Sequence, residues 1–409
     1  MKRFINCAFK IIFSRTLFII LMILVQLAVL CFGFTKLGES FSYITEGMSL
    51  LGALLVIFIV NRDGAPEFKM TWCILICLLP VFGALIYLFV ELNLGGIGLK
   101  ARTYVRLKET EGLLFTTERT KEAVAESPAD FRGFARYMEG TVGFPAYQGS
   151  EAVYYPSGED KFKDLLEELK KAEKFIFLEY FIMERGIMWN AILDILKEKV
   201  KQGVEVRVMY DGMCSILLLP YGYPKELQKY GIKAKMFAPI RPFLSTNQNN
   251  RDHRKIVVID GKVAFTGGVN LADEYINEKE VYGHWKDTAV KITGEAVRSF
   301  TVMYLQMWHV SENGAADEYE KYLQNIVFDK PLKDDGFVIP YGEMPTVPTE
   351  VAKTVYESLF NTAKKYVHVM TPYFIVEQEF FDTMRYAAQR GVEVKMILPH
   401  IPDKKIVYY

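Results

Sequence analysis

The chain has 409 residues, of which 51% are hydrophobic, and its 49 lysines and arginines equal its 49 aspartates and glutamates. A nuclease is expected to carry a basic surface, so this balance argues against nucleic acid as a partner. Of the five cysteines only Cys214 lies outside the hydrophobic N-terminal region, which gives no disulfide framework. No residues are spaced like a zinc site, and we expect neither a metal nor a cofactor.

The excess of apolar residues lies at the N-terminus. Residues 16–34 and 71–90 are almost continuously apolar, and residues 42–60 are weaker because Glu46 interrupts their start. A helix needs about 20 apolar residues to cross a bilayer. We therefore expect a helical transmembrane region over residues 1–95, with two or three spans. Pro80 is compatible with a span, because neighbouring helices can satisfy the freed backbone groups. The flanking lysines and arginines do not settle the orientation.

After a connecting segment, residues 96–150, the pattern changes to alternating strand and helix. Phe175 to Ile182 and Val204 to Tyr210 are apolar, strand-like runs on either side of a stretch with apolar residues near helical spacing. This pattern predicts a βαβ unit and an α/β fold with mixed sheets flanked by helices. Glu179 is the one acid in its strand. It either orients a catalytic histidine, or it caps backbone groups or pairs with an arginine.

A short segment in the middle of the chain combines a nucleophile, a cation and an amide. His253 and Lys255 stand two residues apart beside the β-branched run Ile256 to Ile259, and Asn270 follows two glycines. We expect the histidine and the lysine to lie on one strand and to share a face, since alternate residues of a strand do so. A neutral imidazole can attack phosphorus and form a phosphohistidine, while the lysine and the amide stabilise charge on the phosphate oxygens.

This segment resembles the signature of a known family. The pattern His-x-Lys-x4-Asp followed by Gly-Gly-x-Asn is similar to that of the phospholipase D superfamily, and the longer string from Asn250 to Asn270 resembles bacterial cardiolipin synthases. The resemblance implies phospholipase D-like lobes and a phosphatidyltransferase that joins two phosphatidylglycerol molecules into cardiolipin, releasing glycerol. It also implies anionic membrane lipid as a partner and a multi-pass location in the bacterial cytoplasmic membrane.

The resemblance assigns roles to residues of the motif. It makes His253 the catalytic nucleophile and has Lys255 and Asn270 hold the substrate phosphate. Asp260 belongs to the same catalytic motif, but the pair Asp260-Gly261 is also a strong hairpin signal, which favours a turn role for the aspartate. Glu179 is a candidate supporting residue.

An internal repeat indicates a second lobe. Residues 174–209 and 365–397 share a pattern of strand, helix and strand. His253 lies fifty positions after Gly203, and the same offset from Gly391 falls beyond Tyr409. The second His-x-Lys-x4-Asp motif that the resemblance implies is therefore absent from the sequence. We expect this chain to be a fragment or a truncated product that is inactive alone, unless a missing lobe is supplied or chains associate.

These observations divide the chain into a first lobe with the His-Lys motif at residues 151–312, a linker at 313–350 and an incomplete second lobe at 351–409. Two functions remain open beside the transferase. One is a phospholipase D-type phosphodiesterase, in which water replaces the lipid alcohol. The other is a catalytically silent membrane protein that binds anionic lipid through the half-site.

Overall fold

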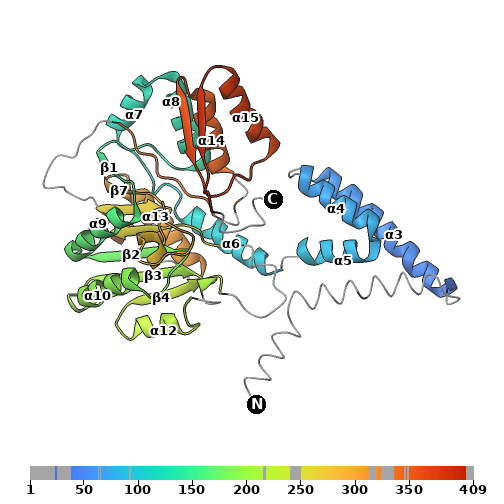
Figure 1. Ribbon diagram of the computed structural model, residues 1–409, viewed down its shortest axis with the longest axis horizontal. Helices are drawn as coiled ribbons and strands as arrows, with labels where there is room; N and C mark the ends of the chain where they lie inside the picture. The colour runs from blue at the N-terminus through green and yellow to red at the C-terminus, as the bar shows by residue number, and fades with distance from the viewer. Residues whose placement is uncertain are drawn as a thin grey trace, which may run out of the picture. The chain divides into compact units, whose positions relative to one another are not determined.

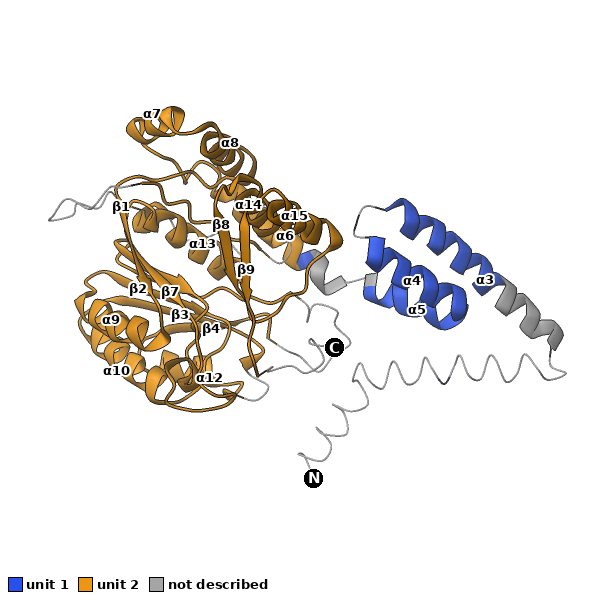
Figure 2. Ribbon diagram, turned by 45° about the horizontal axis from the view of Figure 1, so that its top comes forward, with its two compact units in different colours: residues 1–98, 240–249 blue, residues 99–239, 250–409 orange. Residues whose placement is uncertain are grey.

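The chain forms two compact units (Figure 2), one of residues 1–98 with 240–249 and one of residues 99–239 with 250–409. The computed structural model describes residues 24, 38–62, 64, 66–91, 94–214, 218–239, 250–312, 319–323, 336–344, 347 and 350–401. The expected span at 16–34 lies outside the described residues, apart from Leu24.

The N-terminal unit is helical. It contains α3 (Gly38–Asn61), α4 (Pro66–Leu78), α5 (Pro80–Glu91) and the start of α6 (Leu94–Glu109). The stretch 71–90, expected as one span, is divided between α4 and α5. Pro80 has no backbone N–H and is suited to the first position of a helix, so it begins α5 rather than continuing α4. Across the described residues, none of the helices combines the length and the apolar character required to cross a membrane.

The larger unit is built around a seven-stranded mixed sheet. The strand order is β1-β7-β6-β5-β2-β3-β4, in which β2, β3 and β4 run parallel and the other neighbours are antiparallel. The strands are β1 (Ser150–Tyr155), β2 (Phe175–Tyr180), β3 (Glu205–Asp211), β4 (Lys233–Phe237), β5 (Ile256–Ile259), β6 (Val263–Gly267) and β7 (Ala289–Gly294). The predicted βαβ unit is confirmed as β2, α10 (Ile187–Lys201) and β3.

Helices cover both faces of this sheet (Figure 1). On one face α9 (Gly158–Lys171), α10 and α12 (Tyr223–Gln228) pack against side chains such as Ile176 and Leu178. On the other face α13 (Val297–Val310) packs against Phe177, whose ring stacks on Tyr304 at 4.6 Å between centroids. Burial on both faces explains why the central strands read as continuous apolar runs.

A smaller structural repeat follows towards the C-terminus. It consists of α14 (Val351–Thr362), β8 (Tyr366–Met370), α15 (Gln378–Gln389) and β9 (Glu393–Ile397). β8 and β9 pair in parallel, as β2 and β3 do, which confirms the internal repeat as a second βαβ unit. Two helices, α7 (Glu118–Glu126) and α8 (Ala129–Tyr137), and a π-helical turn (Met138–Val142) precede β1, and short 3-10 helices lie at Asp273–Ile276 and Tyr319–Tyr322.

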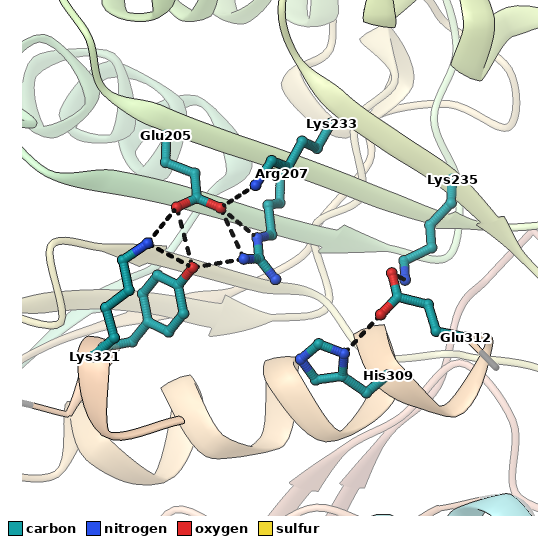
Figure 3. Close-up of polar contacts among 8 residues, drawn as sticks. Glu205, Arg207, Lys233, Lys235, His309, Glu312 and Lys321 are labelled. Carbon is teal, nitrogen blue, oxygen red and sulfur yellow. Dashed lines mark hydrogen bonds and ion pairs between the residues drawn. The ribbon is translucent and has the colours of Figure 1, made fainter. Parts of the chain in front are cut away.

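A charged cluster ties α13 to the edge of the sheet at β4 (Figure 3). The buried Arg207 of β3 donates to Glu205 at 2.8 Å, and Lys233 of β4 binds the same carboxylate. Burial opposes the ionisation of Glu205, but its hydrogen bonds to the lysine and the arginine hold its pKa at about 2. Glu312 binds His309 of α13 at 2.7 Å and a lysine of β4. These carboxylates bind cations of the chain itself, so we assign the cluster a structural role.

Candidate active site

His253 and Lys255 converge, although neither lies on a strand. The strand β5 begins only at Ile256, so the expectation that both residues belong to that strand is wrong. The pair still meets, because residues two apart in an extended segment share a side. The Lys255 Nζ lies 3.3 Å from His253 Nδ1 and donates to the His253 carbonyl at 2.6 Å. His253 is exposed and Lys255 is buried, so the imidazole faces solvent and the ammonium group lies behind it.

Burial gives Lys255 an unusual acidity. It lowers the pKa of Lys255 to about 8, although Asp252 and Asp287 favour the charged form. The Lys255 ammonium also lies 5.5 Å from the centre of the Phe181 ring, which in turn contacts the His253 ring at 4.6 Å between centroids. A cation in such a poorly solvated position interacts strongly with an anion that enters.

A buried charge network supports the segment on its other side. Glu179 is fully buried and accepts a hydrogen bond from Arg254 Nε at 2.7 Å. Burial raises the pKa of Glu179 well above its usual value, and the neighbouring Asp252 adds to the effect against the opposing charge of Arg254. Of the roles considered for Glu179, the structure shows the pairing with an arginine, and that arginine is the residue directly after His253.

A second acid fixes the backbone in front of His253. Asp211 at the end of β3 accepts a hydrogen bond from the Asp252 amide at 2.9 Å and pairs with Arg251 at 3.1 Å. Asp211 also accepts a hydrogen bond from the Met213 amide at 2.8 Å, which holds the turn that follows β3. Its position after a buried strand was the signal that a polar contact would form at this edge of the sheet.

Asn270 is held near the end of β2 by two hydrogen bonds. Its Oδ1 accepts from the Ile182 amide and its Nδ2 donates to the Tyr275 hydroxyl, both at 2.9 Å. The amide is buried. In this structure Asn270 thus joins the segment after β6 to the segment after β2, which closes the same end of the sheet at which Lys255 lies.

Asp287 completes the polar groups at this end. A side chain at Gly268 would collide with its carboxylate, so the absence of a Cβ there makes room for the acid. Burial raises the pKa of Asp287, while Lys255 and Lys161 favour its ionised form. The sequence pattern predicts no role for either Asp287 or Lys161.

Asp260 lies at the opposite end of β5 from His253. Its carboxylate accepts hydrogen bonds from the amides of Glu173, Lys174 and Phe175, and its own backbone has a φ of 53°. These amides lie at the start of β2. Because β5 runs antiparallel to β2, Lys255, which precedes β5, lies at the other end of β2. The structure therefore does not bring Asp260 to the candidate catalytic group, and its contacts are those of a turn residue.

Replacing Asp260 by alanine is expected to destabilise the larger unit by about 3 kcal/mol, because three backbone donors, one of them buried and two part-buried, lose a charged acceptor. Urea unfolding would measure the change. Asp194→Ala is the matched control, since that aspartate is 75% exposed in a surface pair with Lys197 and should change stability by less than about 0.5 kcal/mol. A loss of catalysis without a loss of stability in Asp260→Ala would instead support the catalytic role that the motif implies.

No described group of three or more histidine, cysteine, aspartate or glutamate side chains is arranged to hold a metal ion.

Comparisons with known proteins identify the family of this chain. The family model described as "Cardiolipin synthase, PLD-like domain" matches residues 165–308 and 356–409, and the one described as "Phospholipase_D-nuclease N-terminal" matches residues 50–91. A Streptococcus mutans protein of uncharacterized function is 44% identical over 86% of this chain and 76% of its own length. The cardiolipin synthase of Alkalihalophilus pseudofirmus is 33% identical over 88% of this chain and 71% of its own.

Among solved structures, the phosphatidylserine synthase of Haemophilus influenzae is 16% identical over 62% of this chain and 63% of its own, with a TM-score of 0.43. That likeness is too distant to bear on function. The mixed sheet, the two βαβ units and the family matches define a phospholipase D-like protein. Within that class the chain belongs to the cardiolipin synthase family.

Proposed function

We propose that the protein transfers a phosphatidyl group from one phosphatidylglycerol to another, with His253 as the nucleophile. The observation that carries the proposal is the exposed His253 imidazole backed by the buried Lys255 ammonium group, 3.3 Å from its Nδ1. A phosphodiester that meets the imidazole would place its charged oxygens beside a cation, which is the arrangement that displacement at phosphorus requires.

The reaction balances in two displacements. In the first, an imidazole nitrogen of His253 forms a bond to phosphorus, the bond from phosphorus to the headgroup glycerol breaks, and glycerol leaves with a proton. In the second, a glycerol hydroxyl of another phosphatidylglycerol attacks phosphorus, loses its proton and displaces the histidine, which gives cardiolipin. The family resemblance assigns the proton transfers to a second His-x-Lys motif.

The position of Lys255 selects the attacking atom. Because Lys255 lies at Nδ1, the other ring nitrogen, Nε2, is the one that meets the substrate. Attack by Nε2 requires the imidazole proton to be on Nδ1. A charged lysine is only a hydrogen-bond donor, so it cannot accept a hydrogen bond from a protonated Nδ1. Lys255 must therefore turn from the imidazole to the phosphate oxygens when substrate binds, so phosphate binding and activation of the nucleophile are coupled.

The exposed apolar surface of the N-terminal unit supports a membrane substrate. Its helices expose many large apolar side chains, among them Leu50, Leu54, Ile57, Phe58, Phe68, Ile74 and Leu78. Exposed apolar surface of this extent on a helical unit is typical of a region that meets a membrane or another apolar partner. We propose that this unit holds the protein at the bacterial cytoplasmic membrane, where phosphatidylglycerol is present.

The test is a product analysis with the natural protein that contains residues 1–409. The purified protein is incubated with phosphatidylglycerol that carries an isotope in its acyl chains, and lipid products are identified by mass spectrometry. Labelled cardiolipin with release of glycerol supports the proposal. Phosphatidic acid as the main product would show that the protein hydrolyses the lipid, with water as the acceptor, and would overturn the proposed transfer. The absence of any converted lipid would favour the lipid-binding alternative.

A further inference from the structure

A buried lysine stands in an unfavourable position near the candidate site. Lys161 is 2% exposed and lies in the first turn of α9, which begins at Gly158 after the capping residue Ser157. The N-terminal turn of a helix carries a partial positive charge, and lysines are almost never fully buried unless they are paired. A residue that breaks two local rules at once is expected at a functional or strained site.

The contacts of Lys161 point towards the phosphate-binding residues. Its Nζ donates to the Tyr180 hydroxyl at 3.0 Å, and Tyr180 is the last residue of β2. In the antiparallel ladder of β2 and β5 the last pair is Glu179 with Ile256, so the next step places Tyr180 opposite Lys255. Both lysines therefore lie near the same end of the sheet: Lys255 precedes β5, and Lys161 binds the hydroxyl of Tyr180 at the end of β2.

The N-terminus of α9 is fixed against this end of the sheet. A side chain at Gly158 would collide with the carbonyl of Tyr275, the residue whose hydroxyl binds Asn270. The absence of a Cβ at Gly158 lets the first turn of α9 pack closely on the backbone of Tyr275. The position of Lys161 is thus set by backbone packing.

Other charged groups around α9 are engaged elsewhere. Lys291 of β7 pairs with Asp164 and Glu168 further along the helix, and Glu159 accepts from Asn277 at 2.7 Å. Asp273 accepts from the amides of Ile187 and Met188 at the start of α10. The charge that acts on Lys161 comes from Asp287, which also acts on Lys255.

A charge count at this end of the sheet gives the function of the second lysine. The other acids at this end pair with arginines, Asp252 and Glu179 with Arg254 and Asp211 with Arg251. Of the groups that remain, Lys255 and Asp287 sum to zero, so an incoming phosphodiester with one negative charge would compete with Asp287 for a single cation. With Lys161 charged, the three groups sum to one positive charge, which the phosphodiester neutralises. Burial of unbalanced charge is costly, so the balanced arrangement favours the bound state.

We propose that Lys161 is a positioning residue of the phosphate site: its buried ammonium group, held on the Tyr180 hydroxyl, balances Asp287 and leaves Lys255 available to the substrate phosphodiester. The proposal rests on the function proposed above, since it takes a phosphodiester as the ligand. A purely structural lysine at this position would stabilise the fold, and its replacement would leave anion binding unchanged.

Protonation of Lys161 supports the same arrangement. Burial lowers the pKa of Lys161 to about 7, with Asp287 opposing the shift. Its folded pKa is below the unfolded value, so the folded state is destabilised as pH falls from the unfolded pKa towards about 7, and an anion that binds beside it draws a proton onto it. The contribution of Lys161 to anion binding should therefore be full at pH 6 and largely lost at pH 9.

The test measures the affinity of the full chain for glycerophosphoglycerol, the deacylated headgroup of phosphatidylglycerol, by titration calorimetry. The charge count predicts that Asp287→Asn binds this anion most tightly. The wild type and the double variant Lys161→Met/Asp287→Asn should bind it equally. Lys161→Met should bind it about tenfold more weakly than the wild type at pH 6. The tenfold difference should shrink at pH 9. Lys163→Met, at an exposed position of the same helix, should bind as the wild type does.

Thermal unfolding separates this role from a structural one. Lys161→Met removes a buried cation from a helix N-terminus, so its melting temperature should equal or exceed that of the wild type. Equal binding by Lys161→Met and the wild type, no recovery in the double variant, or failure of Lys161→Met to fold would each overturn the proposal. Because equilibrium binding does not require His253 to react, the predicted order of affinities can hold in a protein that makes no cardiolipin, and that result would refute only the proposed transfer.

Discussion

Replacing His253 by alanine is expected to lower cardiolipin formation by at least about 10⁴-fold, because the variant lacks the atom that bonds to phosphorus. Lys255 cannot compensate for the loss of the imidazole, because it stabilises charge on the phosphate but does not form the covalent intermediate. Stability should change little, as the histidine is exposed. The rate of product formation and the presence of lipid phosphate on the His253 peptide, examined by mass spectrometry under alkaline conditions, are the two measurements.

The matched control is His284→Ala, which removes another exposed histidine of the same unit. That variant should form product and carry the label at His253 as the wild type does. Wild-type rates in His253→Ala, or a label on a different residue, would contradict the assignment of the nucleophile. Loss of activity in both variants would show that the effect is not specific to His253.

The sequence predicted the pair His253 and Lys255 because residues two apart in an extended segment share a side, whatever the local pairing. The strand itself begins three residues after His253. The pairing of Glu179 with Arg254 was one of the alternatives, but the sequence could not select it, because the two residues are joined only when β2 and β5 come together. The same reason hides Asp287 and Lys161, whose contacts depend on loops and helices far apart in the chain.

The fold was predictable where the pattern is local. The run of strand, helix and strand from Phe175 to Asp211 and its repeat near the C-terminus appear as predicted, since apolar periodicity and closing glycines determine them. The N-terminal region shows the limit of the same reasoning. Residues 71–90 form one apolar stretch in the sequence, yet Pro80 begins a new helix. Hydropathy alone does not predict this break.

The arginine that follows His253 is expected to matter for stability as much as the histidine matters for chemistry. Arg254→Met should destabilise the larger unit by about 4 kcal/mol at pH 8, because it leaves the buried Glu179 and Asp252 without their cation. Urea unfolding of the full chain would measure the effect. The control is Arg185→Met, whose partner Glu226 is 44% exposed and whose removal should cost less than about 1 kcal/mol.

The loss in Arg254→Met should depend on pH with a definite sign. The folded-state pKa of Glu179 is already above its ordinary value, and removing the arginine raises it further. A carboxyl group whose pKa is raised by folding stabilises the fold below its unfolded pKa and loses that contribution as pH rises, so the cost of the substitution should be smaller at pH 5 than at pH 8. A cost that is equal at both values, or larger at pH 5, would mean that Arg254 acts through packing and not by neutralising these acids. Since Arg254 lies between the nucleophile and this buried acid pair, the same charge that stabilises the fold also fixes the segment that presents His253.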